Sequence, residues 1–142
     1  MLVEVKAKVS RIINGKAKRR TETYIIPDCE LFVNAEHTVM QKWAEEQELG
    51  LVECSEILSL KQSPIKEICE DTMPGSAFPF IVTLKDLFHD DNGNEKSLRY
   101  QVLLWANDLS QANQRTQQLA RQGYDMQVEG LKQVDYEYIQ RQ

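Results

Sequence analysis

Two histidines and a few acidic groups are the side chains in this sequence that could perform acid–base or metal chemistry. His37 stands beside Glu36 in a segment of helical periodicity. A functional imidazole needs a second group to orient it, so we predict an exposed polar position for His37. His89 opens "HDDNGNE", whose carboxylate and amide oxygens would suit calcium or another hard cation. The stretch lacks the D-x-D-x-D-G-x5-E spacing of an EF-hand, and we predict a solvated turn with no bound metal.

Motifs that build common active sites are missing from the sequence. It contains no GxGxxG, GxxxxGK[ST], GxSxG or HExxH, so the parts that cradle phosphates, transfer acyl groups or hold a protease zinc are not there. We predict that Glu45, Glu46 and Glu48 are solvent-facing charges at the end of a helix. The expectation is a protein that is not an enzyme, with no catalytic residue and no cofactor.

Three cysteines, Cys29, Cys54 and Cys69, are widely spaced and form no CxxC pair. Neither a disulfide framework nor a zinc site follows from this pattern. We predict buried or half-buried free thiols, as free cysteine behaves as a small hydrophobic residue.

Length and composition indicate one compact domain. The chain has 142 residues, of which 42% are hydrophobic and 27% charged, as in ordinary globular proteins. No apolar run is long enough for a membrane span, and "MLVEVKAKVS" alternates instead of forming a signal-peptide core. We expect a cytoplasmic protein without a membrane partner.

The elements that would position any site occur twice. Val3, Val5, Ala7 and Val9 alternate with polar residues as in a half-buried strand, and Asn14-Gly15 predicts a tight hairpin into "TETYIIP". A helix follows over residues 34–50, with Asn34 as its cap, Gly50 at its end and an apolar face of Ala35, Val39, Met40 and Trp43. "LVECSEILSL" predicts a third strand.

The second half has the same order at an offset close to 77, which relates Val3 to Phe80 and Ile25 to Val102. Its segments are "FPFIVTL", "LRYQVLLWA", a helix in "DLSQANQRTQQLARQG" with Asp108 and Gln111 as a capping box and Gly123 at its end, and a last strand "YDMQVEGLKQVDYEYI". We predict tandem duplicated strand-strand-helix-strand units, about residues 2–61 and 77–139.

The predicted fold class is α+β, with antiparallel sheet or sheets and two main helices on one face. A right-handed crossover places the strands of each unit in the order 2-1-3, and the sequence leaves open whether the units share a sheet. The linker, residues 62–76, is predicted to carry one short helix that is capped by Ser63 and begins at Pro64.

Positive charge gathers at the N-terminus of a chain whose net charge is -5. Residues 1–26 hold seven Lys or Arg against Glu4 and Glu22, whereas the rest holds ten against twenty acidic residues. The candidate partner-binding cations are Lys6, Lys8, Lys16, Lys18, Arg19 and Arg20. They could contact phosphates without sequence preference, or protect a strand edge, or attract the acidic part of this chain or of a second copy.

Tyr136 and Tyr138 are the other candidate partner-binding residues, since they share one face of the last strand. Asp135 and Glu137 beside them disfavour stacking on nucleic-acid bases, so a protein-facing patch is the preferred interpretation. We expect a non-enzymatic binding or assembly module with a protein partner. The alternative is nonspecific nucleic-acid binding through the basic hairpin, and a homo-oligomer is compatible with either.

The segments "VEVKAKV", "TETYII", "NAEHTVMQKWAEE", "YQVLLWANDLSQANQRTQQ" and "VEGLKQVDY" resemble an uncharacterised family of small Bacteroidota and phage proteins, described only as a domain of unknown function. The resemblance covers residues 2–138. It implies a bacterial or phage context and no particular activity.

Overall fold

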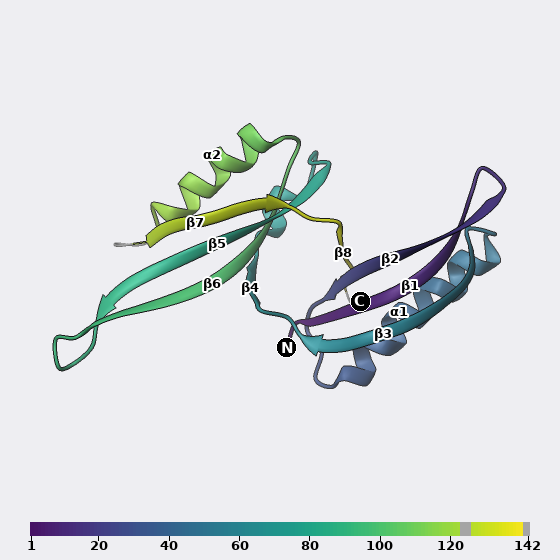
Figure 1. Cartoon of the computed structure of the whole chain (residues 1–142), viewed down its shortest axis with the longest axis horizontal. Coiled ribbons are helices and arrows are strands. Elements are labelled where there is room, and N and C mark those ends of the chain that lie inside the picture. The colour runs from purple at the N-terminus through teal and green to yellow at the C-terminus, as the bar shows by residue number, and fades with distance from the viewer. Residues whose placement is uncertain (123–125, 141–142) are drawn as a thin grey trace. The chain divides into compact units, whose positions relative to one another are not determined.

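The computed structural model describes residues 1–122 and 126–140 and divides the chain into two compact units (Figure 1). Unit 1 combines residues 1–63 with residues 136–142 of the chain, and unit 2 comprises residues 64–135. The fold is α+β, and each unit has a four-stranded sheet of its own with one main helix. The predicted Gly123 and Tyr124 lie outside the described residues.

Unit 1 begins with a long hairpin of β1 (Val3–Ile13) and β2 (Lys16–Ile26), coloured purple in Figure 1. Asn14 and Gly15 have φ values of 54° and 76°, so the predicted tight turn is confirmed. Strand β3 (Val52–Gln62) pairs antiparallel with the other edge of β1. The strands therefore follow the predicted order 2-1-3.

Helix α1 (Phe32–Glu48) covers one face of this sheet (Figure 1). The prediction of Asn34 as its cap is wrong, because the helix begins earlier, at Phe32. The Asn34 side chain instead accepts a hydrogen bond of 2.8 Å from the Leu31 N–H. Gly50 takes φ +72° just after the helix, as predicted. The prediction of Met40 on the buried face is wrong, because its side chain is 52% exposed.

The core of unit 1 lies between the sheet and α1. Period-two alternation in β1 and β2 and helical spacing in α1 bring inward the apolar residues that the sequence predicted, with the exception of Met40. The buried cluster consists of Val3, Val5, Ala7, Val9, Tyr24, Ile26, Cys29, Ala35, Val39, Trp43 and Val52.

Unit 2 contains the hairpin of β5 (Phe78–His89) and β6 (Glu95–Ala106), helix α2 (Leu109–Ala120) and β7 (Met126–Gln133). Strand β7 pairs antiparallel with β5, which gives the order 2-1-3 again. Asp108 caps α2 by accepting a hydrogen bond of 2.7 Å from the Gln111 N–H. The Gln111 side chain accepts in turn from the Asn107 N–H at 2.8 Å.

The predicted last strand is divided between the two sheets. Its first part is β7 of unit 2, whereas β8 (Tyr136–Tyr138) pairs in parallel with β2 in unit 1. The segment after β3 behaves in the same way, because β4 (Ile65–Ile68) pairs in parallel with β6 in unit 2. Both sheets are therefore mixed and not purely antiparallel as predicted. Strand β4 also replaces the short helix predicted from Pro64, and only a 3-10 turn, η1 (Glu70–Thr72), follows it.

Pairing registers relate the two units position by position. Val5 pairs with Tyr24 in unit 1, and Val82 pairs with Val102 in unit 2. The offset between corresponding residues is therefore 82 − 5 = 77 for β1 and β5, and 102 − 24 = 78 for β2 and β6. Ile25 corresponds to Leu103, and the sequence alignment with Val102 is one residue out of register.

No helix in the described part of the chain combines the length and the apolar character that crossing a membrane requires.

Candidate interaction surface

The two faces of the β1–β2 hairpin carry different cations. Residues paired across the strands lie on the same face, and the helix-side face contains Val5 and Tyr24. The pairs Val9–Arg20, Arg11–Lys18 and Ile13–Lys16 continue that face toward the turn. The opposite face holds Lys6 beside Thr23, Lys8 beside Thr21, and Arg19 beside Ser10.

Some of the cations in the β1–β2 hairpin form ion pairs within unit 1, in a network around Glu22. Both Arg11 nitrogens Nε and Nη2 donate to the Glu22 carboxylate, the latter at 2.7 Å, and Arg20 Nε donates to it at 2.8 Å. Arg11 also donates to Glu46 on α1. The prediction that Glu46 is a solvent-facing charge is wrong, because its side chain is only 13% exposed.

These contacts set the ionisation of Glu22. Burial alone would raise its pKa, but hydrogen bonds from Arg11, Tyr24 and Arg20 outweigh burial and lower the pKa to about 2. Burial, followed by the hydrogen bond that Tyr24 Oη donates to Glu22 at 2.5 Å, raises the pKa of Tyr24 well above its ordinary value. The Trp43 indole N–H donates to the same phenol oxygen at 3.1 Å. Tyr24 therefore links the charged network around Glu22 to Trp43 in the core of unit 1.

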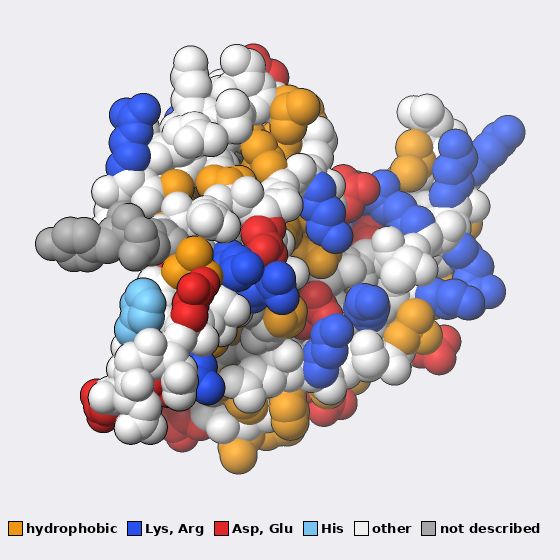
Figure 2. All heavy atoms as spheres, turned by 60° about the vertical axis from the view of Figure 1, so that its left-hand side comes forward, with side chains coloured by type: hydrophobic (Ala, Val, Ile, Leu, Met, Phe, Trp, Pro, Cys, Tyr) orange, Lys and Arg blue, Asp and Glu red, His pale blue; other side chains and the backbone are white. Residues whose placement is uncertain are grey.

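The surplus cations lie outside this network. Lys6, Lys8, Lys16, Lys18 and Arg19 are all exposed, and none forms an ion pair with another described residue of unit 1. Figure 2 shows Lys and Arg side chains gathered where the hairpin reaches its turn. We call these five residues the free cations.

One edge of β2 is open beside the free cations. Strand β8 covers only Thr23, Tyr24 and Ile25, and in the described structure Lys16–Glu22 pair with β1 alone. A two-residue turn closes on a hydrogen-bonded pair, which here is Ile13–Lys16. Starting at the next residue, Ala17, every second residue of β2 therefore points its N–H and C=O away from β1.

Those outward residues on the open edge are Ala17, Arg19 and Thr21. Farther along, Ile25 has the same phase, and its carbonyl accepts a hydrogen bond of 3.0 Å from Ile139 N–H beyond β8. Sequence pattern does not distinguish Ala17 and Thr21, because their role depends on where β8 stops. We call residues 16–22 the free edge.

Tyr136 and Tyr138 lie opposite α1, beside Thr23 and Ile25. They therefore share the sheet face of Lys6, Lys8 and Arg19, whereas Lys16, Lys18 and Arg20 are on the other face. Glu137 points toward α1, where its carboxylate lies 3.0 Å from Lys42 Nζ. The structure thus brings together only part of the predicted set on any one face.

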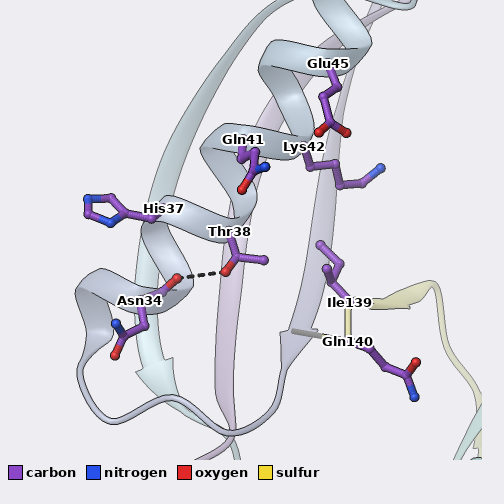
Figure 3. A pocket seen from close by; sticks show the side chains of 8 residues that line it. All are labelled: Asn34, His37, Thr38, Gln41, Lys42, Glu45, Ile139 and Gln140. Carbon is purple, nitrogen blue, oxygen red and sulfur yellow. Dashed lines mark hydrogen bonds between the residues drawn. The ribbon is translucent and has the colours of Figure 1, made fainter. Parts of the chain in front are cut away.

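A polar hollow of about 590 Å³ lies between α1 and the residues after β8 (Figure 3). Lys42 and Glu45 line it from the helix, and Ile139 and Gln140 line it from the other side. The His37 ring points away from Lys42 and Glu45 (Figure 3). These titratable groups do not converge on one point as an acid–base site would require.

Asp90 organises the turn between β5 and β6, whose oxygen atoms are of the kind that bind hard cations. Its carboxylate oxygen Oδ1 accepts hydrogen bonds from the N–H groups of Asn92 and Asn94 at 3.0 and 2.9 Å. His89 ends β5 and is paired with Glu95. Within residues 1–122 and 126–140, no three His, Cys, Asp or Glu side chains form a group that could hold a metal ion.

Comparisons with known proteins identify a family without assigning an activity. No curated protein and no solved structure matches the chain significantly. A family model described as "Domain of unknown function (DUF4494)" matches residues 2–139, which is nearly the whole sequence. The chain therefore belongs to the DUF4494 family.

Proposed function

We propose that this protein is a non-enzymatic binding or assembly module, and that unit 1 binds a protein partner by accepting an extended segment along the free edge. The observation that carries this proposal is the row of outward backbone groups at Ala17, Arg19 and Thr21, in a strand stretch exposed from Lys16 to Thr21. Addition of a strand to such an edge supplies backbone hydrogen bonds for affinity.

The chain itself already uses this edge. Strand β8 pairs with residues 23–25 of β2, and the Ile139 N–H just beyond β8 donates a hydrogen bond to the Ile25 carbonyl. The register between β1 and β2 is regular along their whole length, whereas β3, on the other side of the sheet, has irregular pairing with β1 after Lys6 and after Ser10. Irregular strands discourage further pairing, so β2 is the better acceptor.

The substitution Ala17→Pro tests the proposal. It removes an outward N–H and places a ring on the free edge, yet it changes no charge and breaks no bond to β1. Ser97→Pro is the matched control, because Ser97 occupies in β6 the position of Arg19 in β2 and also points outward. Both variants should keep the wild-type circular dichroism spectrum.

The measurement is crosslinking and affinity capture from the cells that encode the protein. A partner should be captured by the wild type and by Ser97→Pro, and capture should fall with Ala17→Pro. Equal capture of the same partner by all three forms would rule out binding at the free edge.

Nonspecific nucleic-acid binding is a second candidate, favoured by the free cations. Phosphate contacts need positive charge and no strand edge, and their affinity falls with salt. A labelled single-stranded oligonucleotide would then bind wild type and Ala17→Pro equally. Replacement of Lys16, Lys18 and Arg19 by Ala would weaken that binding and reduce its salt dependence. If the oligonucleotide binds neither form at low salt, this candidate is eliminated.

We also infer a tandem duplication as the origin of the two units, supported by the matching orders β3-β1-β2-β8 and β7-β5-β6-β4. A bacterial or phage context and a cytoplasmic location belong to the same proposal. The resemblance noted in the sequence supports the first, and the wide cysteine spacing without a CxxC pair supports the second.

A further inference from the structure

We infer that the segment received by the free edge is an acidic stretch of a protein partner, with acidic side chains at consecutive positions. This inference rests on the proposed function and adds the chemistry of the partner. It is carried by the free cations of the open strand β2, with Lys16 and Lys18 on one face and Arg19 on the other.

Side chains of an added strand would meet cations on either face. Neighbouring strands lie about 4.8 Å apart, and successive side chains point to opposite faces. On the helix-side face a partner side chain would lie beside Lys16 or Lys18. On the other face it would lie beside Arg19, with Lys8 one strand farther away. Carboxylates at neighbouring positions are therefore matched on both faces beside Lys18 and Arg19, whereas side chains beside Ala17 and Thr21 meet no charge on this strand.

The ion pairs in the described part of unit 1 use other cations, which leaves the free cations available to a partner. Glu22 and Glu46 are held by Arg11, Arg20 and Lys42, and the Glu4 carboxylate lies 3.0 Å from Lys61 Nζ. An acidic partner supplies the missing counter-charges without breaking these pairs.

A second copy of this chain does not fit the edge through its own β2. Pairing two free edges would bring the Lys16, Lys18 and Arg19 side chains of both copies close together, and like charges on adjacent strands destabilise a sheet. Charge therefore favours a different, acidic chain over a symmetric dimer at this strand.

Unit 2 provides an internal comparison. The corresponding stretch of β6 carries Glu95 and Lys96, and Arg99 Nε is 2.6 Å from Glu129 of β7. This edge has no surplus charge. An acidic segment should therefore select unit 1 even though the two sheets have the same strand order.

The test is a fluorescence anisotropy titration of the full chain with three labelled peptides of one length. The first alternates short acidic runs with Val and Thr, the second has Gln for every acidic residue, and the third has the acidic composition with interspersed Pro. The acidic extended peptide should bind, and the other two should bind about tenfold more weakly, because one loses the charge pairs and the other the backbone hydrogen bonds.

Protein variants locate the binding site. Lys18→Ala should weaken binding of the acidic peptide about two- to fivefold, and Ala17→Pro about tenfold. Lys96→Ala, the corresponding change in unit 2, should leave the affinity unchanged. Equal binding of the acidic and Gln peptides, or equal binding by wild type and Ala17→Pro, would overturn the inference.

The failure of this inference is distinguishable from failure of the proposed function. If a cellular partner is captured in a way that depends on Ala17 but survives replacement of Lys16, Lys18 and Arg19 by Ala, edge binding stands and the acidic partner is wrong. If an oligonucleotide competes with the acidic peptide and binds Ala17→Pro normally, the free cations serve nucleic acid instead.

Discussion

The Glu137 carboxylate lies 3.0 Å from the Lys42 ammonium, on the side of the sheet opposite to its sequence neighbours Tyr136 and Tyr138. Lys42 also binds Glu46 at 2.8 Å within α1, so β8 is joined to the charge network of the helix. In the sequence, Glu137 argues against base stacking by the two tyrosines. In the structure it lies on the other face of the sheet from Tyr136 and Tyr138. Strand alternation, and not proximity in sequence, decides which charges accompany an aromatic side chain.

Replacement of Glu22 should make unit 1 less stable and change its response to acid. The folded-state pKa of about 2 lies below the ordinary 4.5, so the carboxylate contributes stability that is complete above pH 4.5 and is lost as the pH falls through 2. Glu22→Gln should lower the free energy of unfolding at neutral pH by about 2 kcal/mol, allowing for solvent screening. Urea unfolding at several pH values measures both effects.

Glu129→Gln is the matched control for this prediction, because Glu129 pairs with Arg99 in an exposed position on unit 2. Exposed ion pairs contribute little, so the loss should be much smaller than for Glu22→Gln. A Glu22→Gln protein with the acid response of wild type would show that the network does not stabilise the fold through Glu22.

The turn at Asn14-Gly15 should lose stability when its second residue carries a Cβ. Gly15 has φ +76°, a conformation that costs an L-residue about 1–2 kcal/mol, although open space surrounds the position of a Cβ. Gly15→Ala should therefore lower the unfolding free energy by about 1 kcal/mol. Gly130 lacks a positive φ, and a Cβ there would meet Thr83 at an ordinary 3.9 Å. Thermal unfolding should show Gly130→Ala to be close to neutral, and equal losses would contradict the turn geometry.

Local pattern predicted the elements that depend on neighbouring residues. Alternation in β1, the Asn14-Gly15 turn and the Asp108 cap each leave a signal within a few positions, and the structure contains all three. Strands β4 and β8 are only four and three residues long. Strand β4 follows the strands of unit 1 in the chain but pairs within unit 2, and β8 follows the strands of unit 2 but pairs within unit 1. Nothing in so short a segment indicates a partner that is distant in the chain.

The sequence predicted which charged residues lie in the candidate surface. It did not predict which of them form ion pairs or where the strand edge is open. The composition of residues 1–26 reveals the cations. It does not reveal that Arg11 and Arg20 form ion pairs with Glu22. The spacing of Lys42 and Glu46 was the one local sign of the network, since residues four apart meet on a helix. The free edge depends on where β8 ends, which the sequence pattern does not reveal.

The three thiols should differ in reactivity with an alkylating reagent. The prediction of buried or half-buried thiols is wrong for Cys54, which is exposed, whereas Cys69 is half-buried and Cys29 is 1% exposed. Burial, together with Glu67 and Asp71, raises the pKa of Cys69 to about 11, which makes its reactive thiolate scarce. Mass spectrometry of the folded protein should show modification in the order Cys54, Cys69, Cys29. Faster labelling of Cys29 than of Cys54 would contradict the packing of unit 1.

The segment at β8 should be held by packing more than by charge. Ile139 packs against the core of unit 1, and its N–H donates to the Ile25 carbonyl at 3.0 Å. The Glu137 side chain is 47% exposed, so its ion pair with Lys42 is screened by solvent. Ile139→Ala should therefore lower the free energy of unfolding by about 1–3 kcal/mol, and Glu137→Gln by less than about 1 kcal/mol.

Hydrogen exchange should reveal the same difference at the strand edge. Thr23 and Ile25 point toward β8, so their amides should exchange faster in Ile139→Ala than in wild type, whereas Glu137→Gln should leave them protected. Outward amides of the free edge, such as that of Arg19, should exchange rapidly in all three proteins because β8 does not reach them. Protection of Arg19 equal to that of Thr23 in the wild type would mean that the free edge is covered, and a segment of a partner could then not pair with it.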